Sequence, residues 1–293
     1  MACSIGSWLT WVVTILLSTL MVCASQVTSR ATQTALDTEA IDRFITEHMA
    51  IHRVPGLALA ITLGDKVLFV TGYGTARDDQ PVTPQAQFFV GSLSKSFTAL
   101  AIMQLVEAGQ IDLDTPVHTY LPEFTLADPV HASHITIRHL LHQVSGLSDM
   151  GFLASRPPQS ATIAEHVAEL RAARPVAAPG MEFHYFDPNY AVLARIVEVV
   201  SEEPFAAYLH THVFAPLRML HSISVVTTSE AAHKADRLAQ GHVVVFGCPI
   251  ACAEMSGYLG GSGGVISTAA DMAHYLIMQN NGGRFGDARL LSP

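Results

Sequence analysis

The sequence predicts an α+β fold in which a helix and a β-hairpin precede a long helical region. Residues 37–51 carry apolar side chains at helical spacing, and residues 56–74 contain two apolar runs separated by a two-residue turn. From residue 88 onward the apolar spacing is mostly helical, and strands do not alternate regularly with helices. That order does not fit a doubly wound parallel sheet, because such a sheet requires the alternation.

The composition indicates a folded protein with a large core. Of the 293 residues, 49% are hydrophobic and only 14% are charged. A disordered chain has the opposite balance, with few hydrophobic and many charged residues. Acidic residues outnumber basic ones, 25 against 16, and no cluster of Lys and Arg provides the basic face typical of a nucleic-acid-binding protein. Only Lys66, Lys95 and Lys234 are lysines, so a lysine within an apolar helix is informative.

The N-terminal segment predicts export. Residues 8–22 are strongly apolar and uncharged, but they are fewer than the roughly 20 residues of a membrane-spanning helix. Small residues around position 23 fit a cleavage site, so we expect a signal peptide over residues 1–24 and a linker over residues 25–36. The residues before the apolar run lack Lys and Arg, which leaves an uncleaved membrane anchor as the alternative. The expected location is periplasmic, extracellular or membrane-anchored.

The predicted domain covers residues 37–293 and begins with an amphipathic helix over residues 37–51. The hairpin that follows has Gly64-Asp65 as its turn. The helix is predicted by apolar residues that share one face: Ile41, Phe44, Ile45 and Met49.

Helices dominate the remainder of the predicted domain. Residues 88–109 indicate a helix that is apolar on most sides and therefore buried, and Gly109 is a suitable end for it. Residues 110–180 predict short helices and loops. Further helices are expected over residues 188–200, 205–214 and 269–278.

Ser92 and Lys95 are the first candidates for chemistry. They are three positions apart at the start of the buried helix, so the hydroxyl and the amine share a face. A serine needs a base to become a nucleophile, and a lysine can serve because burial favours a neutral amine, whereas an arginine stays protonated. The structural alternative is that Ser92 caps the helix and Lys95 reaches solvent.

Tyr185 and Asp187 are the second candidates, just before the helix that begins at Pro188. A phenol can relay a proton between a nucleophile and a leaving group. Asp187 or Asn189 can present polar atoms to a substrate. Taken alone, the simpler interpretation is that Tyr185 lies at the edge of the core and that Asp187 caps the helix.

Ser262 is the third candidate, because Gly260–Gly264 matches the G-x-S-x-G pattern of the α/β-hydrolase nucleophile. That pattern requires a buried strand before the serine and a helix directly after it, and the preceding residues do not predict such a strand. We therefore interpret the segment as a flexible glycine turn. An esterase that uses Ser262 remains a further alternative.

No cofactor or metal is expected. None of the 15 histidines lies in a recognised metal-binding pattern, and Cys248 and Cys252 lack additional ligands at a suitable spacing. In an oxidising compartment the two cysteines either form a disulfide or remain free thiols, and the sequence leaves both open.

Five segments follow one another in the order of a known superfamily: PGLALAI, FFVGSLSKSFTALAIMQLVEAGQIDLDTPVHTYLPEF, ITIRHLLHQVSGLSD, PGMEFHYFDPNYAVLARIVE and GGSGGVISTAADMAHYL. They resemble the serine β-lactamases and penicillin-binding proteins, most closely the class C branch with its D-aminopeptidases, D-Ala carboxypeptidases and esterases. The resemblance implies a β-lactamase/transpeptidase-like fold, with a helical lobe inserted in an α/β lobe that has an antiparallel sheet.

The resemblance also implies a role for each candidate residue. Ser92 is then the acylated nucleophile, and Lys95 is its partner base. Tyr185 takes the tyrosine position of the Y-x-N motif, and Asp187 takes the substrate-binding position of that motif. The backbone N–H of Ser92 forms half of an oxyanion hole.

Three departures from the family pattern are expected to matter. Asp187 stands where Asn is usual, and a carboxylate there favours a protonated Lys95, which opposes its use as a base. Gln143 stands where many relatives have His. The third motif, K-T-G or H-x-G on a late strand, is absent from the sequence. The resemblance therefore implies that the chain is truncated at its C-terminus, without the strand that supplies the second oxyanion donor and the centre of the sheet.

We therefore expect an exported serine hydrolase that forms an acyl-enzyme and releases the product to water. Its expected partner is a small-molecule or peptidoglycan-peptide substrate, namely a β-lactam, a D-amino-acid peptide or a small ester. The alternative is a non-catalytic or decayed penicillin-binding-like protein that lacks the third motif. The sequence leaves open which substrate is used and which oligomeric state is formed.

Overall fold

The computed structural model describes residues 36–149, 162–252 and 258–293. The described residues from 40 onward belong to one compact unit, and residues 36–39 belong to the segment that precedes it. The predicted signal peptide and all but the last residue of the predicted linker lie outside the described residues. Within the described residues, no helix combines the length and the apolar character needed to cross a membrane.

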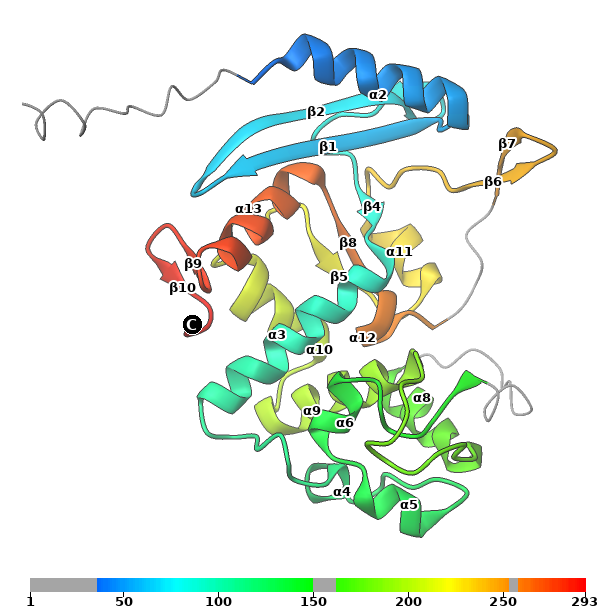
Figure 1. Ribbon diagram of the computed structural model, residues 1–293, viewed down its shortest axis with the longest axis vertical. Coiled ribbons are helices and arrows are strands. Elements are labelled where there is room, and N and C mark those ends of the chain that lie inside the picture. The colour runs from blue at the N-terminus through cyan, green and yellow to red at the C-terminus, as the bar shows by residue number, and fades with distance from the viewer. Residues whose placement is uncertain (1–35, 150–161, 253–257) are drawn as a thin grey trace, which may run out of the picture. The chain divides into compact units, whose positions relative to one another are not determined.

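A helix and a β-hairpin begin the described chain (Figure 1), as the sequence predicts. Helix α2 (Thr38–His52) is followed by the antiparallel strands β1 (Gly56–Leu63) and β2 (Lys66–Arg77). Their turn is Gly64-Asp65, and Gly64 has a φ of 58°, in the left-handed region that glycine enters without strain. A short strand β3 (Gln80–Pro81) extends this sheet in the order β1-β2-β3.

A second antiparallel sheet contains residues that the sequence predicted as the start of the buried helix. Its strands are β4 (Phe88–Phe89), β8 (Val265–Ser267) and β5 (Ile223–Ser224), in the order β4-β8-β5. The prediction of a helix beginning at residue 88 is therefore wrong, because the backbone of β4 pairs with β8. Pairing with a segment so distant in sequence outweighs the local apolar pattern.

Two helices form the centre of the core. The turn η1 (Gly91–Leu93) leads into α3 (Ser94–Glu107), and Gly109 follows that helix with a φ of 72°, as expected of a glycine at a helix end. Helix α9 (Pro188–Ser201) packs against α3, and most of its residues are buried. The largest fully buried side chains include Phe97, Phe186 and Phe214.

Short helices surround this pair, as the sequence predicts. Between α3 and α9 the described helices are α4 (Val117–Tyr120), α5 (Pro129–His134), α6 (Ile137–Leu141), α8 (Ile163–Glu169) and η3 (Leu170–Ala172). After α9 come α10 (Phe205–Leu209), the π-helical turn η4 (His210–Phe214), α11 (Thr228–Lys234), α12 (Gly260–Gly263) and α13 (Ala269–Asn280), and then the strands β9 (Arg284–Phe285) and β10 (Ala288–Arg289).

Helix α13 connects the hairpin to the core. It packs against β1 and β2, and its Tyr275 ring stacks on Phe97 of α3 with the ring centroids 4.1 Å apart. The hairpin therefore has a helical neighbour on one face. Among the described residues, β1 pairs with β2 and with no other strand, so its second edge has no strand beside it.

The two cysteines lie at a hairpin that the sequence did not predict. Strand β6 (His242–Val245) pairs with β7 (Cys248–Ala251), and both Cys248 and Cys252 are free. Four positions along an extended chain span roughly 13 Å, whereas the Cα atoms of a disulfide lie within about 7 Å of each other. Of the two states that the sequence left open, the structure shows the free thiols.

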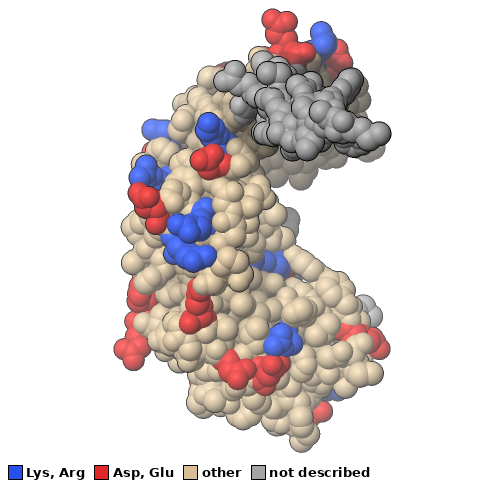
Figure 2. All heavy atoms as spheres, turned by 60° about the vertical axis from the view of Figure 1, so that its left-hand side comes forward, with Lys and Arg blue, Asp and Glu red and all other residues tan. Residues whose placement is uncertain are grey.

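Charged side chains are sparse on the face drawn in Figure 2. Lys and Arg lie interspersed with Asp and Glu there, and most of the surface belongs to other residues. This pattern agrees with the low charged fraction of 14%.

Candidate active site

Ser92 and Lys95 lie together at the start of α3. Lys95 Nζ donates a hydrogen bond of 3.3 Å to Ser92 Oγ. Ser92 is exposed, whereas the Lys95 side chain is only 10% exposed. The N-cap of α3 is Leu93, and no side chain caps the helix. The alternative in which Ser92 is the cap and Lys95 reaches solvent is therefore wrong.

Tyr185 approaches the same hydroxyl from the segment before α9. Its Oη donates a hydrogen bond of 2.8 Å to Ser92 Oγ. Lys95 Nζ lies 4.8 Å from the centroid of the Tyr185 ring, a distance typical of a cation–π contact. Tyr185 is 48% exposed, so it faces Ser92 at the surface and is not a core-edge residue. The structure thus brings three of the four predicted site residues together around one oxygen atom.

Asp187, the fourth predicted residue, contacts Lys95. Its Oδ1 lies 2.6 Å from Lys95 Nζ. Asp187 occupies the N-cap position of α9, with Pro188 directly after it, but its side chain makes no capping hydrogen bond. The predicted N-cap position of Asp187 is confirmed, but its carboxylate does not cap the helix, because it forms an ion pair with the Lys95 ammonium group.

A backbone carbonyl of the glycine segment also contacts Lys95. The Ser262 carbonyl oxygen accepts a 3.0 Å hydrogen bond from Lys95 Nζ. Ser262 is buried in α12, and its own Oγ donates to the Leu259 carbonyl oxygen at 2.9 Å. Strand β8 follows α12, where the α/β-hydrolase pattern requires a helix. The interpretation as a flexible turn is therefore wrong, and Ser262 lacks the context of a nucleophile.

Close packing explains the glycines of α12. A Cβ atom at Gly261 would lie 2.5 Å from the Tyr190 carbonyl oxygen and 2.6 Å from Ala194 Cβ, both in α9. Only glycine lets the two helices approach so closely. In the sequence, the run of glycines indicated that another segment packs closely here, but it did not indicate that this segment is α9.

Gln143 holds the backbone on both sides of Tyr185. Its main-chain oxygen accepts a 2.9 Å hydrogen bond from His184 N, and its side-chain Oε1 accepts a 3.2 Å hydrogen bond from Phe186 N. Gln143 is buried and has a φ of 60°, an uncommon conformation for a residue other than glycine. We infer that this conformation is maintained by the two contacts, which position the tyrosine.

Asn189 belongs to the same buried network. Its Nδ2 donates to Gln143 Oε1 at 2.6 Å, and its Oδ1 accepts from Ser145 Oγ at 2.9 Å. Asn189 is 1% exposed. Its suggested role in presenting polar atoms to a substrate is therefore wrong, and sequence reasoning missed its role as a buried anchor.

Two titratable side chains near these residues have shifted pKa values. Burial raises the pKa of Tyr190, and the nearby Tyr185 raises it further. Burial lowers the pKa of His166, although Glu169, 3.2 Å from its Nδ1, and Asp187 act in the opposite direction. At neutral pH the lowered value favours the uncharged imidazole.

An apolar cavity of about 560 Å³ lies beside the serine turn. It is lined by residues 56–60 of β1, by residues 88–90, by Leu93 and by residues of α13. Leu93 directly follows Ser92 in the chain, but neither Ser92, Lys95 nor Tyr185 lines the cavity. Among the described residues, no group of three or more His, Cys, Asp or Glu side chains is arranged to hold a metal ion.

An α+β fold with a serine, a lysine and a tyrosine around one oxygen at the start of a buried helix defines a class of serine hydrolases. Residues 41–293 match the model of the Beta-lactamase family. The chain therefore belongs to the Beta-lactamase family, a family of serine hydrolases, and its fold is the β-lactamase/transpeptidase-like fold that the resemblance implies.

Characterised relatives and solved structures agree with this membership. The chain is 32% identical over 260 residues to penicillin-binding protein 4 of Amycolatopsis lactamdurans, covering 87% of this chain and 66% of that protein. It is 28% identical over 200 residues to protein flp of Staphylococcus aureus, covering 67% of this chain. The octameric penicillin-binding protein homologue from Pyrococcus abyssi has a TM-score of 0.72 and 28% identity, over 88% of this chain and 58% of that one.

The matched relatives are longer than this chain. The chain spans 40% of the length of protein flp and 66% of penicillin-binding protein 4. What those proteins bind or catalyse as a whole is therefore not transferred here.

Proposed function

We propose that this protein is an exported serine hydrolase that forms an acyl-enzyme on Ser92. The observation that carries the proposal is the convergence of Tyr185 Oη at 2.8 Å and Lys95 Nζ at 3.3 Å on Ser92 Oγ. Both distances lie within or close to the range over which a proton passes between a nucleophile and its base.

The proposed reaction begins with attack of Ser92 Oγ on a substrate carbonyl carbon. The hydroxyl proton moves to Lys95 or Tyr185, and the carbonyl π electrons move to the oxygen, which becomes an oxyanion near the Ser92 backbone N–H. When the oxyanion collapses, the leaving group departs and takes up the proton. A water molecule then attacks the acyl-enzyme, and the acid is released with Ser92 restored.

The proposed substrates are β-lactams, D-amino-acid peptides of peptidoglycan and small esters. A family that includes a penicillin-binding protein supports the first two classes.

A non-catalytic binding protein is the second candidate function. The observation that favours it is the 2.6 Å contact between Asp187 and Lys95, because a carboxylate at that distance stabilises the ammonium form, which cannot accept a proton.

A labelling experiment separates the two. The purified protein is treated with a fluorescent fluorophosphonate and, separately, with a fluorescent penicillin, beside Ser92→Ala and Ser262→Ala variants. The catalytic proposal expects an adduct in the wild type and in Ser262→Ala, and none in Ser92→Ala. A folded wild type without an adduct supports the binding protein, and labelling lost only in Ser262→Ala supports the α/β-hydrolase alternative.

Export has its own test. When the gene is expressed with its N-terminal segment in a bacterial host, cleavage at the proposed site gives a mature protein that begins at Ser25. Mass spectrometry of the exported fraction checks this. An intact N-terminus in the membrane fraction supports the uncleaved anchor, and an intact protein in the cytosol contradicts export.

A further inference from the structure

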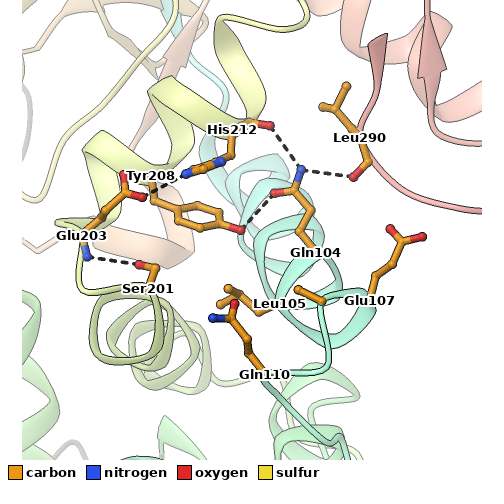
Figure 3. Close-up of a pocket in the computed structure, with 10 residues that line it drawn as sticks. Gln104, Leu105, Glu107, Gln110, Ser201, Glu203, Tyr208, His212 and Leu290 are labelled. Carbon is orange, nitrogen blue, oxygen red and sulfur yellow. Dashed lines mark hydrogen bonds and ion pairs between the residues drawn. The ribbon is translucent and has the colours of Figure 1, made fainter.

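A second cavity lies at the opposite end of α3 from Ser92. It measures about 520 Å³, opens to solvent, and is lined by the ends of α3 and α9, by α10 and η4, and by Leu290 (Figure 3). Ser92 precedes α3 and Leu105 lies in its last turns, so the rise of the helix places the cavity roughly 20 Å from the serine. None of the residues that line it belongs to the candidate active site.

One half-buried amide, that of Gln104, connects the walls of this α3–α10 cavity. Gln104 Nε2 donates to the carbonyl oxygens of His212 and Leu290, both at 3.2 Å. Gln104 Oε1 accepts from Tyr208 Oη at 3.3 Å, and Figure 3 shows these contacts converging on the side chain. The amide of Gln104 therefore joins three chain segments, namely α3, the continuous helix α10–η4 and the strand end at Leu290.

The charged groups of the α3–α10 cavity are carboxylates. Glu107 and Glu203 line it, and neither Lys nor Arg does. Glu203 Oε1 lies 3.0 Å from His212 Nε2, which leaves the cavity acidic even when that imidazole is protonated. Burial, with a further contribution from Glu203, raises the pKa of Tyr208 to about 12. An anionic ligand would meet two carboxylates here, and the one imidazole that could carry positive charge already contacts Glu203.

Apolar groups make up much of the remaining lining. Leu105, Ala108 and Leu290 provide aliphatic surface, and Tyr208 provides an aromatic ring. In Figure 3 the ring lies between Glu203 and Gln104. A cation gains from an aromatic face and from carboxylates, whereas an aliphatic substituent gains from the Leu and Ala side chains.

We propose that the α3–α10 cavity binds a small organic cation, an alkylammonium ion whose charge lies near Glu107 and Glu203 and whose alkyl part contacts Leu105 and Tyr208. The site is separate from Ser92 and does not depend on acyl transfer. The proposal therefore stands or fails independently of the hydrolase function.

Calorimetric titration with choline tests the proposal, because its uncharged analogue 3,3-dimethylbutan-1-ol has nearly the same shape. We expect saturable binding of choline at one site with a millimolar or lower Kd, and binding of the alcohol that is at least several-fold weaker. Equal binding of the two compounds, or no saturable binding of choline to the folded protein, overturns the proposal.

Four variants locate the bound cation. Glu107→Gln and Glu203→Gln remove one charge each and are expected to raise the Kd of choline roughly three- to fivefold. Glu202→Gln removes a neighbouring exposed carboxylate that does not line the cavity, and should leave the Kd unchanged. Asp187→Asn should also leave it unchanged. An unchanged Kd in both cavity variants, or loss of binding in Asp187→Asn, overturns the assignment, and thermal melting verifies that each variant is folded.

Discussion

Lys95 Nζ lies 2.6 Å from Asp187 Oδ1 and 3.3 Å from Ser92 Oγ, so one amine contacts both a carboxylate and the candidate nucleophile. The lysine side chain is 10% exposed and the aspartate side chain is 58% exposed. Solvent therefore screens the pair mainly from the aspartate side. A base must be a neutral amine, whereas the carboxylate stabilises the ammonium form, so the residue at position 187 is expected to control the reactivity of Ser92.

Replacement of Asp187 by Asn should increase the reactivity of Ser92. We expect the Asp187→Asn variant to react with a fluorophosphonate roughly tenfold faster at pH 7, because an amide does not stabilise the ammonium form of Lys95. Time courses of in-gel fluorescence measure the rate. Asp114→Asn breaks an ion pair with Arg138 elsewhere and should leave the rate unchanged. Equal or slower labelling of a folded Asp187→Asn variant would contradict the prediction.

Replacement of Lys95 by Arg should abolish the reaction without removing the charge. The guanidinium can still pair with Asp187, but it does not lose its proton, so it cannot act as a base. We expect labelling of Ser92 to fall at least about 100-fold, the usual contribution of a general base. Lys66→Arg, at an exposed position, is the control. A Lys95→Arg rate within tenfold of the wild type would show that Tyr185 is sufficient as the base.

Two glycine variants test the packing of α12 on α9. Gly261→Ala places a Cβ atom 2.5 Å from a backbone oxygen of α9, and we expect a loss of about 1–3 kcal/mol in the free energy of unfolding. Gly263→Ala is the matched control, since its nearest neighbour is Leu259 Cδ2 at 3.8 Å. It should remain within about 1 kcal/mol of the wild type. Urea denaturation measures both, and equal losses would contradict the contact.

The hydrogen bonds of Gln143 should make a large contribution to stability. Gln143→Met keeps the size of the side chain but leaves the Phe186 N–H and Asn189 Nδ2 without their acceptor. Each buried donor costs about 1–3 kcal/mol when it is unpaired, so we expect a total loss of about 2–4 kcal/mol. Labelling of Ser92 should also slow, because Tyr185 lies between the two residues that Gln143 holds.

The exposed Gln80→Met variant is the control for both measurements. A Gln143→Met variant with the stability of Gln80→Met and unchanged labelling would show that the network does not position the tyrosine.

Acid should destabilise the protein through His166. The imidazole has a pKa of 6.5 in the unfolded chain, and burial holds it lower in the folded protein. As the pH falls below 6.5, the unfolded state takes up the proton first. The contribution of His166 to the free energy of unfolding is therefore complete above pH 6.5. It is lost as the pH falls from 6.5 to the lower pKa that His166 has in the folded protein. The melting temperature, measured from pH 8 to pH 5, should show this decline.

Two variants assign the decline to this residue. His166→Gln cannot take up the proton, so its melting temperature should fall less steeply between pH 6.5 and pH 5 than that of the wild type. His118→Gln, at an exposed position, should keep the slope of the wild type. Parallel slopes for the wild type and His166→Gln would rule out His166 as the origin.

Local sequence patterns were sufficient for the elements that depend on local interactions. The spacing of apolar residues predicted α2 and α9 to within a residue or two, and Gly64-Asp65 marked the hairpin turn. Patterns of this kind failed for β4 and for the β6–β7 hairpin. Pairing with β8 determines β4, and β6 and β7 are exposed along their whole length, so neither shows the alternation of a strand with one buried face.

The sequence by itself determined which residues are the candidates for chemistry and to which family the chain belongs. Ser92, Lys95 and Tyr185 were named from their spacing and from the order of the motifs, which are properties of the chain alone. Only the tertiary structure decided that the carboxylate of Asp187, the N-cap residue of α9, contacts Lys95 and makes no capping hydrogen bond. It also decided that Ser262 contributes a carbonyl oxygen and not a nucleophile. The physical reason is that these contacts join segments far apart in the chain, and their geometry depends on how α3, α9 and α12 pack together.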